Sequence, residues 1–412
     1  SVFSASDFRD LNDKLNLRLT GSINSEEGHV SGISKDDRLL FIENLSRMRQ
    51  VSLESQWHDS DDVVGWFELE RFSRGLELFK KDRMLIDYTD MLNLFLTRGR
   101  APKLDVMFVD EAQDLSPLQW AVVRKLCESA DRIYIAGDDD QAIYRWAGAD
   151  VDYLIRNSKD AMVLKQSYRI PKSIHNLAER CIGQVGARVH KTWNPRKEEG
   201  HVSWEPSYES IDMESGEWLV LARTNYLLNG IEEHCRSEGW FYKNKNRPSV
   251  SEKKIMAVRA WENFRKGGLI PIIELTKVLN YLKIRVPSSL EMIDFDTNVS
   301  FEQAKKYVPR LVNEYWYDAF VGVSVSERSY IRAMLRRGEK ITKEPRIKLS
   351  TIHAAKGGEA ENVILLTDIS NRIYKSFQSN PDDESRVFYV GLTRAKENLF
   401  LIEPQTQKYF PL

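Results

Sequence analysis

The chain has 412 residues, of which 42% are hydrophobic and 29% are charged, so a disordered chain is excluded and two or three domains are expected. The 60 lysines and arginines balance 61 aspartates and glutamates, so net charge does not decide for or against a nucleic-acid partner. No apolar run reaches the roughly 18 residues of a membrane span. The three cysteines are far apart and fit neither a zinc site nor a disulfide framework. We therefore expect a cytoplasmic protein without a membrane partner.

Residues 1–90 are mostly polar and predict helices. Apolar residues recur there at helical spacing in two ranges, Ile33–Met48 and Val63–Phe79. Farther along, short apolar segments alternate with helical ones such as Pro117–Ser129 and Ser173–Ile182, which predicts an α/β fold with largely parallel sheets. The expected strands are Val106–Val109, Ile133–Ala136, Met162–Leu164, Trp218–Ala222, Lys348–Ile352, Asn362–Leu366 and Asn398–Ile402.

Basic residues gather in two parts of the chain. Between Lys243 and Arg259 lie six basic residues and one acid, Glu252, and a second group runs from Arg328 to Lys348. Such groups suit a phosphate backbone, and a solvated helix face explains each of them equally well. Strand-like segments resume after this stretch, so residues 243–345 are interpreted as a helical, basic insertion into the second α/β unit.

Two adjacent carboxylates, Asp110 and Glu111, follow the expected strand Val106–Val109. In open α/β sheets, ligands bind beyond the carboxyl ends of the strands. One carboxylate in that position can hold Mg²⁺ while its neighbour orients a water for attack on a phosphoryl group. A solvated acidic turn is the alternative for this pair taken alone.

A second segment, Gly137–Ala147, follows the next expected strand. Gln141 can contact a terminal phosphate or its attacking water. Tyr144 and Trp146 flank Arg145 and can stack on unpaired bases, which contributes about 1–3 kcal/mol per base; packing in a core is the alternative for these aromatics. The aspartates at 138–140 can also be read as a metal-nuclease site, which we disfavour because no histidine or glutamate accompanies them.

Three further segments carry candidate residues. Leu164–Arg169 is expected to be a strand that opens into a helix at Pro171, and Arg169 can reach a γ-phosphate as a fork of donors, a role worth about 10³–10⁵ in rate. Thr351 and His353 precede a turn with paired glycines, where backbone can approach a ligand. Arg394 is placed at a helix start before the last strand. The alternative for His353 is a purely structural role, and the alternative for Arg394 is a salt bridge.

In this order, the five segments resemble the motifs of superfamily 1A DNA helicases of the UvrD/PcrA/Rep type, and the likeness runs from about Ile86 to the C-terminus. Residues 110–114 resemble the family's Walker B segment, which implies that Asp110 serves Mg²⁺ and Glu111 the hydrolytic water. The resemblance further implies that Gln141 couples the γ-phosphate to DNA and that Arg169 and Arg394 are the two arginine fingers.

The same resemblance implies binding residues for ATP and DNA. Tyr168 would stack on the adenine, Glu359 would lie near the ribose, and Gly357 belongs to the glycine turn beside it. Residues 221–224 are similar to a family segment that touches DNA. The implied DNA-binding residues are Tyr144, Arg145, Trp146, Arg223, Thr224, Thr351 and His353.

Family members contain two RecA-like domains of the P-loop NTPase type, each with a parallel sheet and an inserted helical region. By this resemblance, residues 1–90 are the insertion of the first domain and residues 91–165 its remainder. Residues 166–242 and 346–412 form the second domain, and residues 243–345 its insertion. The implied activity is ATP- and Mg²⁺-dependent translocation in the 3′→5′ direction on single-stranded DNA, with unwinding at single-strand/duplex junctions, by a monomer.

The chain departs from the family pattern at three points. Ala147 stands where members often have arginine, and Gly358 replaces the usual leucine before Glu359. No Gly-x-x-x-x-Gly-Lys-Ser/Thr phosphate loop occurs, because the nearest imitation, Gly186–Thr192, has His190 where the glycine belongs. We expect an N-terminal piece of about 30 or more residues to be absent and the chain alone to be inactive. The alternative is a helicase-derived DNA- or partner-binding module without ATPase activity, although such a module has no need for all five catalytic candidates.

Overall fold

The computed structural model describes residues 1–21, 34–60, 64–341 and 343–412. The chain divides into two compact units. The first comprises Ser1–Trp204, Leu221–Asn225 and Thr351–Leu412, and the second comprises Glu205–Val220 and Tyr226–Ser350. No helix in the described ranges is long and apolar enough to cross a membrane.

The N-terminal part of the first unit is helical, as predicted from its spacing. Ser34 caps the second helix by accepting a hydrogen bond from the backbone N–H of Asp37, and Asp87 caps the fifth in the same way. The expected starting residues Ile33 and Val63 lie outside the described residues. Leu39, Ile42, Leu69 and Phe72 are buried together, which confirms these parts of the predicted apolar faces, whereas Phe67, also expected on the second face, is 83% exposed. The helices are α1 (Ala5–Leu15), α2 (Lys35–Arg49), α3 (Leu53–His58), α4 (Trp66–Asp82) and α5 (Tyr88–Arg98).

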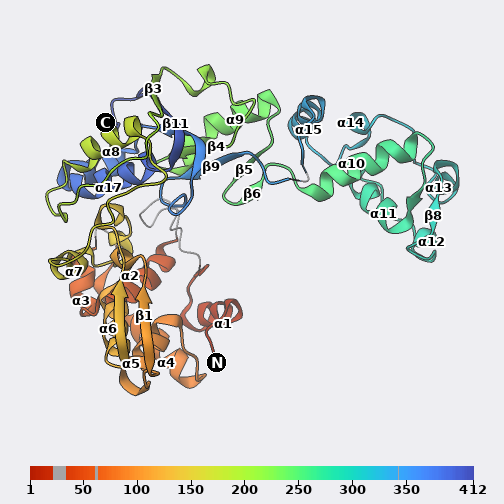
Figure 1. Cartoon of the computed structure of the whole chain (residues 1–412). Helices are drawn as coiled ribbons and strands as arrows, with labels where there is room; N and C mark the ends of the chain where they lie inside the picture. The colour runs from red at the N-terminus through yellow and green to blue at the C-terminus, as the bar shows by residue number, and fades with distance from the viewer. Residues whose placement is uncertain (22–33, 61–63, 342) are drawn as a thin grey trace. The chain divides into compact units, whose positions relative to one another are not determined.

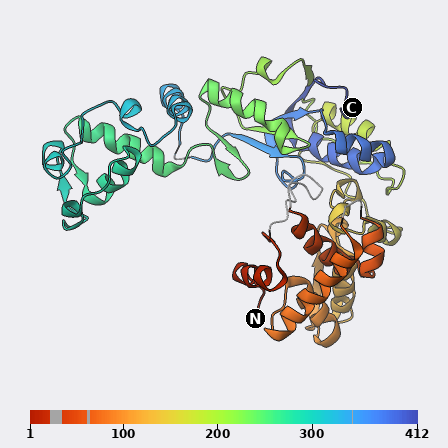
Figure 2. The same ribbon diagram turned by 180° about the vertical axis from the view of Figure 1, so that it is seen from behind.

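A parallel pair of strands follows these helices. β1 (Leu104–Val109) and β2 (Ala130–Ile135) are in register from Leu104 opposite Ala130 to Val109 opposite Ile135, so both expected strands are confirmed. Figure 1 shows this pair facing the viewer, and Figure 2 shows the orange and red helices in front of it from behind. The elements that follow the strands are the short helices η1 (Ala112–Asp114), η2 (Asp139–Gln141) and η3 (Arg145–Ala147), and the longer helices α6 (Pro117–Cys127) and α7 (Val151–Asn157).

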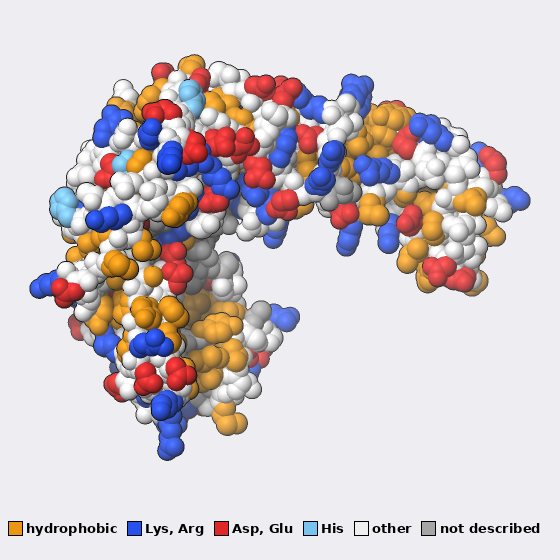
Figure 3. Space-filling view, viewed as in Figure 1, with side chains coloured by type: hydrophobic (Ala, Val, Ile, Leu, Met, Phe, Trp, Pro, Cys, Tyr) orange, Lys and Arg blue, Asp and Glu red, His pale blue; other side chains and the backbone are white. Residues whose placement is uncertain are grey.

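One face of the β1–β2 pair is apolar and exposed. Phe108 is 76% exposed and Tyr134 is 52% exposed, and their rings stack at 5.2 Å. Figure 3 shows hydrophobic side chains gathered over this part of the surface. Val109 of β1, Trp120 and Leu154 are buried together and form a small hydrophobic core beside these strands.

The expected strand Met162–Leu164 does not form. These residues have no regular secondary structure, and Met162 and Leu164 are 85% and 81% exposed. A strand needs a neighbour to satisfy its backbone groups, and only Gln166 forms an isolated bridge, to Asn194. The predicted helix after Pro171 is present as α8 (Lys172–Ile182).

Seven strands form the larger sheet, in the order β3-β11-β10-β4-β9-β5-β6. β10 pairs in parallel with β11, and β5 in parallel with β9, whereas β5 and β6 form an antiparallel hairpin. This mainly parallel sheet confirms the predicted α/β class and its last four expected strands. The strands are β3 (His201–Glu205), β4 (Trp218–Ala222), β5 (Tyr242–Asn244), β6 (Arg247–Pro248), β9 (Ile347–Thr351), β10 (Ala360–Leu366) and β11 (Ala395–Ile402).

Two helices near the C-terminus belong to the first unit, α16 (Asn371–Ser379) and α17 (Pro381–Leu392). Pro381 at the first position of α17 fixes where that helix begins. The expectation that Arg394 begins a helix is wrong, because α17 ends at Leu392 and Arg394 lies in the short connection to β11. Nε of Arg394 donates a 2.9 Å hydrogen bond to the carbonyl oxygen of Val390 in the last turn of α17, and this contact sets the direction of the side chain.

The second unit contains the whole stretch 243–345 that was expected to be a helical insertion, together with residues 205–220, 226–242 and 346–350. The first residues of the expected insertion are not helical, because Lys243 and Arg247 lie in the β5–β6 hairpin. Trp261 and Trp316 are fully buried among its helices. The elements are α9 (Asn229–Glu238), α10 (Glu252–Arg265), β7 (Ile270–Pro271), α11 (Ile272–Tyr281), α12 (Ser288–Glu291), β8 (Asn298–Val299), α13 (Phe301–Tyr307), α14 (Trp316–Ala319) and α15 (Val325–Arg337).

Candidate functional site

The carboxylates Asp110 and Glu111 are exposed at the carboxyl end of β1. Glu111 has φ 51° and ψ 40°, in the left-handed region, and its N–H donates a 2.9 Å hydrogen bond to Oδ1 of Asp110. A non-glycine residue held in that conformation costs about 1–3 kcal/mol, and such strain persists where the surrounding structure fixes it. The turn therefore presents both side chains in a defined direction beyond the strand.

Gln113 is a buried residue that fixes this turn. Its Nε2 donates to the carboxylate of Glu111, and its Oε1 accepts a 2.9 Å hydrogen bond from the N–H of Asp138. A Cβ atom at Gly137 would lie 2.9 Å from that Oε1 atom, so glycine permits the close approach. Gln113 thus ties the segment after β1 to the segment after β2. Gln113 was not predicted as a site residue, although it lies within the Walker B-like segment.

Lys356, between β9 and β10, joins the same two segments to the segment that contains Thr351 and His353. Its Nζ donates to Oδ2 of Asp114 and to the carbonyl oxygen of Gln141 at 2.9 Å, and it lies 3.8 Å from Oε2 of Glu111. The ammonium also sits 5.1 Å from the centre of the Tyr144 ring. Burial raises the pKa of the Asp114 carboxyl more than Lys356 lowers it. This residue too was missed, although it is the lysine of the Thr351–Glu359 segment.

Gln141 and Arg394 are in direct contact. Arg394 donates through NH2 to Oε1 of Gln141 at 3.3 Å and through NH1 to the carbonyl oxygen of Gly358 at 3.2 Å. Burial, followed by the positive charge of Arg169, lowers the pKa of Arg394 to about 10. An arginine with its charge poorly solvated in this way attracts anions strongly, because no water screens it.

Arg169 reaches the same cluster from the residues before α8. Its NH1 lies 3.5 Å from Oε2 of Glu359, whose other oxygen is 2.8 Å from Nζ of Lys396. The hydrogen bond from Lys396 is the main cause that lowers the pKa of Glu359. Tyr168 is 87% exposed, and Gly357, in the turn just before Glu359, has φ 80°.

The contacts described above bring Glu111, Gln141, Arg169, Glu359 and Arg394 together. We call these five residues and Lys356 the carboxylate–arginine cluster.

The aspartates at 138–140 do not form a metal site. Lys191 and Arg188 bind their carboxylates through ion pairs of 2.6–3.0 Å. Throughout the described ranges, no group of three or more histidine, cysteine, aspartate or glutamate side chains could hold a metal ion. The nuclease alternative therefore has no ligand set in this part of the chain.

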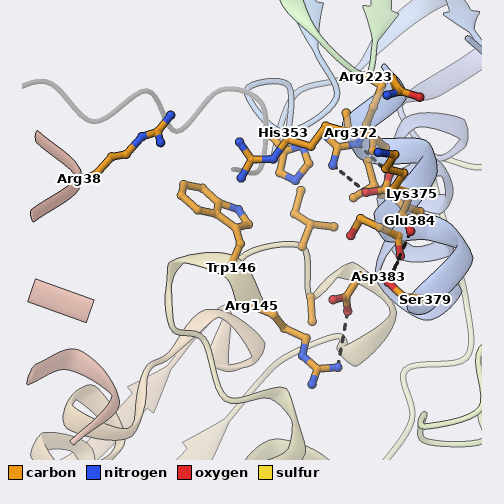
Figure 4. Close-up of a pocket in the computed structure, with 16 residues that line it drawn as sticks. Arg38, Arg145, Trp146, Arg223, His353, Arg372, Lys375, Ser379, Asp383 and Glu384 are labelled. Atoms are coloured by element: carbon orange, nitrogen blue, oxygen red, sulfur yellow. Dashed lines mark hydrogen bonds and ion pairs between the residues drawn. The ribbon is translucent and has the colours of Figure 1, made fainter. Parts of the chain in front are cut away.

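A cavity of about 720 Å³ lies beside η3 in the first unit. Trp146 and His353 line it, and α16 and α17 contribute its opposite wall (Figure 4). The lining residues are Arg38, Ala142, Ile143, Arg145, Trp146, Arg223, His353, Asn371, Arg372, Ile373, Lys375, Ser376, Ser379, Asp383, Glu384 and Val387. Five of the charged lining residues are basic and two are acidic, so the cavity favours anions.

Ion pairs neutralise part of this charge. Arg223 binds Glu384 in a buried, two-pronged pair at 2.7 Å, and NH1 of Arg145 lies 3.5 Å from Oδ1 of Asp383. Arg372 and Lys375 are exposed on α16 and form no ion pair with any residue that the structure describes. These two side chains supply the positive charge that remains available in the cavity.

Of the two aromatic residues predicted to bind DNA, Trp146 lines the cavity and Tyr144 contacts Lys356 of the cluster. Trp146 stacks on Phe41 of α2, with ring centres 6.2 Å apart, and its indole N–H has no partner among the described residues. Tyr144 donates from its hydroxyl to the carbonyl oxygen of His353 at 3.1 Å. Thr224 and Thr351 are buried and lie outside the cavity lining, so neither is placed against a ligand there.

Two family models match this chain. The UvrD/REP helicase N-terminal domain matches residues 32–162, and the UvrD-like helicase C-terminal domain matches residues 324–406. Together they cover just over half of the chain, and they contain the segments after β1, β2, β9 and α17. The chain belongs to the UvrD/Rep helicase family.

Curated relatives in this helicase family are distant in sequence. A probable DNA helicase II homolog of Rickettsia conorii is 22% identical, over 98% of this chain and 80% of its own length. The ATP-dependent DNA helicase PcrA of Bacillus subtilis is 23% identical, over 75% of this chain and 56% of its own length. A probable DNA helicase II homolog of Mycoplasma pneumoniae is 22% identical, over 82% of this chain. The chain spans less than two thirds of the Mycoplasma and Bacillus relatives.

Proposed function

We propose that this chain forms most of an ATP-driven DNA motor, in which the carboxylate–arginine cluster hydrolyses ATP and the cavity beside η3 binds single-stranded DNA. The observation that carries the proposal is a set of short contacts between the two places. Lys356 contacts Asp114, Gln141 and the ring of Tyr144, while Tyr144 donates to the backbone of His353 in the cavity wall. We propose that these contacts couple the two places, so that a change at one alters the other.

The cluster residues suit a magnesium-bound polyphosphate. Arg169 and Arg394 bring two guanidinium groups to one point, and the buried Nε of Arg169 has no partner among the described residues. Asp110 offers an exposed carboxylate of the kind that Mg²⁺ prefers. We assign the metal to Asp110, the adenine to Tyr168 and the ribose to Glu359, with Gly357 in the adjoining turn. The ion, when bound, would neutralise phosphate charge.

Each cluster residue has a separate task in the proposed reaction. Glu111 orients and deprotonates the attacking water, and its left-handed backbone holds the carboxylate at the end of β1. Arg169 and Arg394 stabilise the charge that develops on the transferred phosphoryl group. Gln141 lies between Arg394 and the segment that carries Tyr144, so it senses the phosphate and passes its state to the DNA side.

We assign the DNA strand to the cavity. Trp146 offers a half-buried ring for base stacking, and Arg372 and Lys375 can contact phosphates. Arg145, Arg223 and His353 also line this cavity, whereas Thr224 and Thr351 would support its walls. We further propose, from the family, 3′→5′ movement, action at single-strand/duplex junctions and a monomeric state.

The domain assignment follows the same proposal. Residues 91–165 would be the first RecA-like domain with an inserted region at 1–90. Residues 166–242 and 346–412 would be the second, with an inserted region at 243–345. Support comes from the two family models: the N-terminal domain model matches residues 32–162, and the C-terminal domain model matches residues 324–406, which begins within the proposed second insertion and extends through most of residues 346–412.

The test is ATP turnover by the protein expressed from its complete coding sequence, with and without single-stranded DNA. Glu111→Gln is expected to abolish DNA-stimulated phosphate release and to leave DNA binding unchanged, because it removes only the proton acceptor. Glu128→Gln, an exposed change at the end of α6, is the matched control and should turn over like the wild type.

Two results would contradict the proposal in different ways. Turnover that survives Glu111→Gln would remove that residue from its assigned role. DNA binding without any ATP hydrolysis by the wild type would identify a helicase-derived binding module instead. Displacement of a strand from duplexes with a 3′ or a 5′ tail separately tests the direction of movement.

A further inference from the structure

A cation from a distant loop lies at the centre of the aspartates at 138–140. Nζ of Lys191 is 2.7 Å from Oδ1 of Asp138 and 3.0 Å from Oδ2 of Asp140, and it also binds Asp139. The side chain of Lys191 is 13% exposed, so water screens these pairs poorly. Lys191 belongs to the loop between α8 and β3, in the stretch that imitates a phosphate loop.

The three carboxylates depend on Lys191 to different degrees. Asp140 is also held by the two-pronged guanidinium of Arg188, at 2.9 and 2.6 Å. Asp139 also accepts a 2.7 Å hydrogen bond from the N–H of Val189. For Asp138, Lys191 is the one cation that pairs with the carboxylate among the residues that the structure describes. Lys191 is likewise the one cation that pairs with Asp139 among the described residues, and Asp138 also accepts hydrogen bonds from the N–H of Asp140 and from Nε2 of Gln141.

Asp138 in turn holds the side chain of Gln141. Nε2 of Gln141 donates to Oδ2 of Asp138 at 2.7 Å, and Oε1 of Gln141 accepts from NH2 of Arg394 at 3.3 Å. Because the amide group is planar, fixing its nitrogen also fixes the direction of its oxygen. A continuous chain of hydrogen bonds thus runs from Lys191 through Asp138 and Gln141 to Arg394.

We propose that Lys191 is a positioning residue, which orients the Gln141 amide through Asp138 so that its oxygen faces Arg394. This inference rests on the proposed function of Gln141 and Arg394 and adds a residue to it. A lysine that only neutralised the acidic stretch would support folding without setting the direction of Gln141. Of the three carboxylates that Lys191 contacts, Asp138 is the one that binds the side chain of Gln141, so the effect of Lys191 on Gln141 passes through Asp138.

The first test needs no turnover. In a crystal structure of the 412-residue chain with Lys191→Met, we expect the Gln141 amide to leave hydrogen-bond distance of Asp138 and Arg394. Asp138→Leu tests the same link with a side chain of similar size that has no acceptor for Gln141, should loss of the lysine impair folding. A Gln141 side chain that keeps both contacts in these variants overturns the proposal.

The second test is a double-mutant cycle on DNA-stimulated ATP turnover by the protein expressed from its complete coding sequence. Lys191→Met is expected to lower kcat about tenfold with KM for ATP unchanged, since hydrogen bonds to charged groups are of that strength. Lys191→Arg, which keeps the charge, should retain most of the rate. Adding Lys191→Met to Gln141→Ala should cause no further loss, because both changes break one chain of contacts.

Lys197→Met removes an exposed lysine from the same loop and is the matched control, expected to leave kcat unchanged. Additive losses in the double variant would overturn the role of Lys191 while leaving that of Gln141 intact. A Gln141→Ala variant with the wild-type rate would instead contradict the proposed function, and the crystal structure would then decide whether Lys191 still positions the amide.

Discussion

Arg394 donates a hydrogen bond of 3.3 Å to the side chain of Gln141, although 253 residues separate the two along the chain. Arg394 follows the end of α17, and Gln141 ends η2 after β2. The contact joins the two parts of the chain that match separate helicase domain models. In the proposed function, a phosphate bound by Arg394 would act through this contact on the segment that carries Tyr144 and Trp146.

Replacing Arg394 by alanine should reduce DNA-stimulated ATP turnover by about 10³–10⁵, the range found for arginine fingers. The loss should be in kcat, because the guanidinium acts on charge that develops during the reaction. Stopped-flow phosphate release measures it. Arg394→Lys, which keeps a charge but cannot form the two-pronged contact to Gln141 and Gly358, should recover only a small part.

Arg394 is 1% exposed, so each variant needs a folding control by thermal unfolding. If Arg394→Ala folds and hydrolyses ATP at the wild-type rate, the residue has only a structural role through its hydrogen bonds, and the cluster loses its second finger.

The buried pair of Arg223 and Glu384 should matter for stability. Their side chains are 4% and 7% exposed, so Arg223→Ala leaves a carboxylate buried without its counter-ion. Removing one member of such a pair costs about 3–5 kcal/mol. Urea unfolding followed by tryptophan fluorescence gives the free energy, and the exposed Arg156→Ala in α7 is the control. A loss no greater than the control's would mean that water reaches Glu384.

Trp146→Ala should weaken single-stranded DNA binding. Loss of one stacked base costs about 1–3 kcal/mol, which is a factor of about 5–150 in Kd. Fluorescence anisotropy with a labelled oligonucleotide measures the change. Trp204→Ala removes a 45% exposed tryptophan that lies outside the cavity lining and should leave Kd unaltered. Equal affinities for the two variants would return Trp146 to a packing role against Phe41.

The three cysteines should differ in reactivity. Burial raises the pKa values of Cys181 and Cys235 to about 12, so both remain neutral thiols near pH 8, whereas Cys127 is half-buried and its pKa rises less. A thiolate is the reactive form, so a disulfide reagent should modify Cys127 first and the other two only after unfolding. Fast modification of all three in the native protein would contradict the packing of α8 and α9.

The sequence predicted the elements that carry local signals. Val106–Val109 ends in two acids, and Trp218–Ala222 is a continuous apolar run; both form the strands that were expected. Met162–Leu164 has the same local pattern and forms none, because strand formation also depends on a neighbour that no single segment encodes. Arg394 was predicted at the start of a helix because the sequence pattern around it did not reveal α17, the helix that ends at Leu392 just before it.

The contacts of the site could not be read from local patterns. Lys356 lies 242 residues from Asp114, and Lys191 lies 52 residues from Asp139. A signal for a cation such as Lys191 was nevertheless present, since consecutive aspartates, of which Asp139 and Asp140 are buried, need cations beside them. Arg223 illustrates the opposite case, because its family motif implied DNA while the fold gives it a buried partner in Glu384.

The central claim is that the cluster hydrolyses ATP in response to DNA in the cavity, and Gln141→Ala tests it most directly. The measurement is the ratio of ATP turnover with and without single-stranded DNA, together with Kd for that DNA. We predict that wild type is stimulated strongly and that the variant loses most of the stimulation while Kd is unchanged. Stimulation of the variant equal to that of wild type, or wild-type turnover that is indifferent to DNA, would contradict the account.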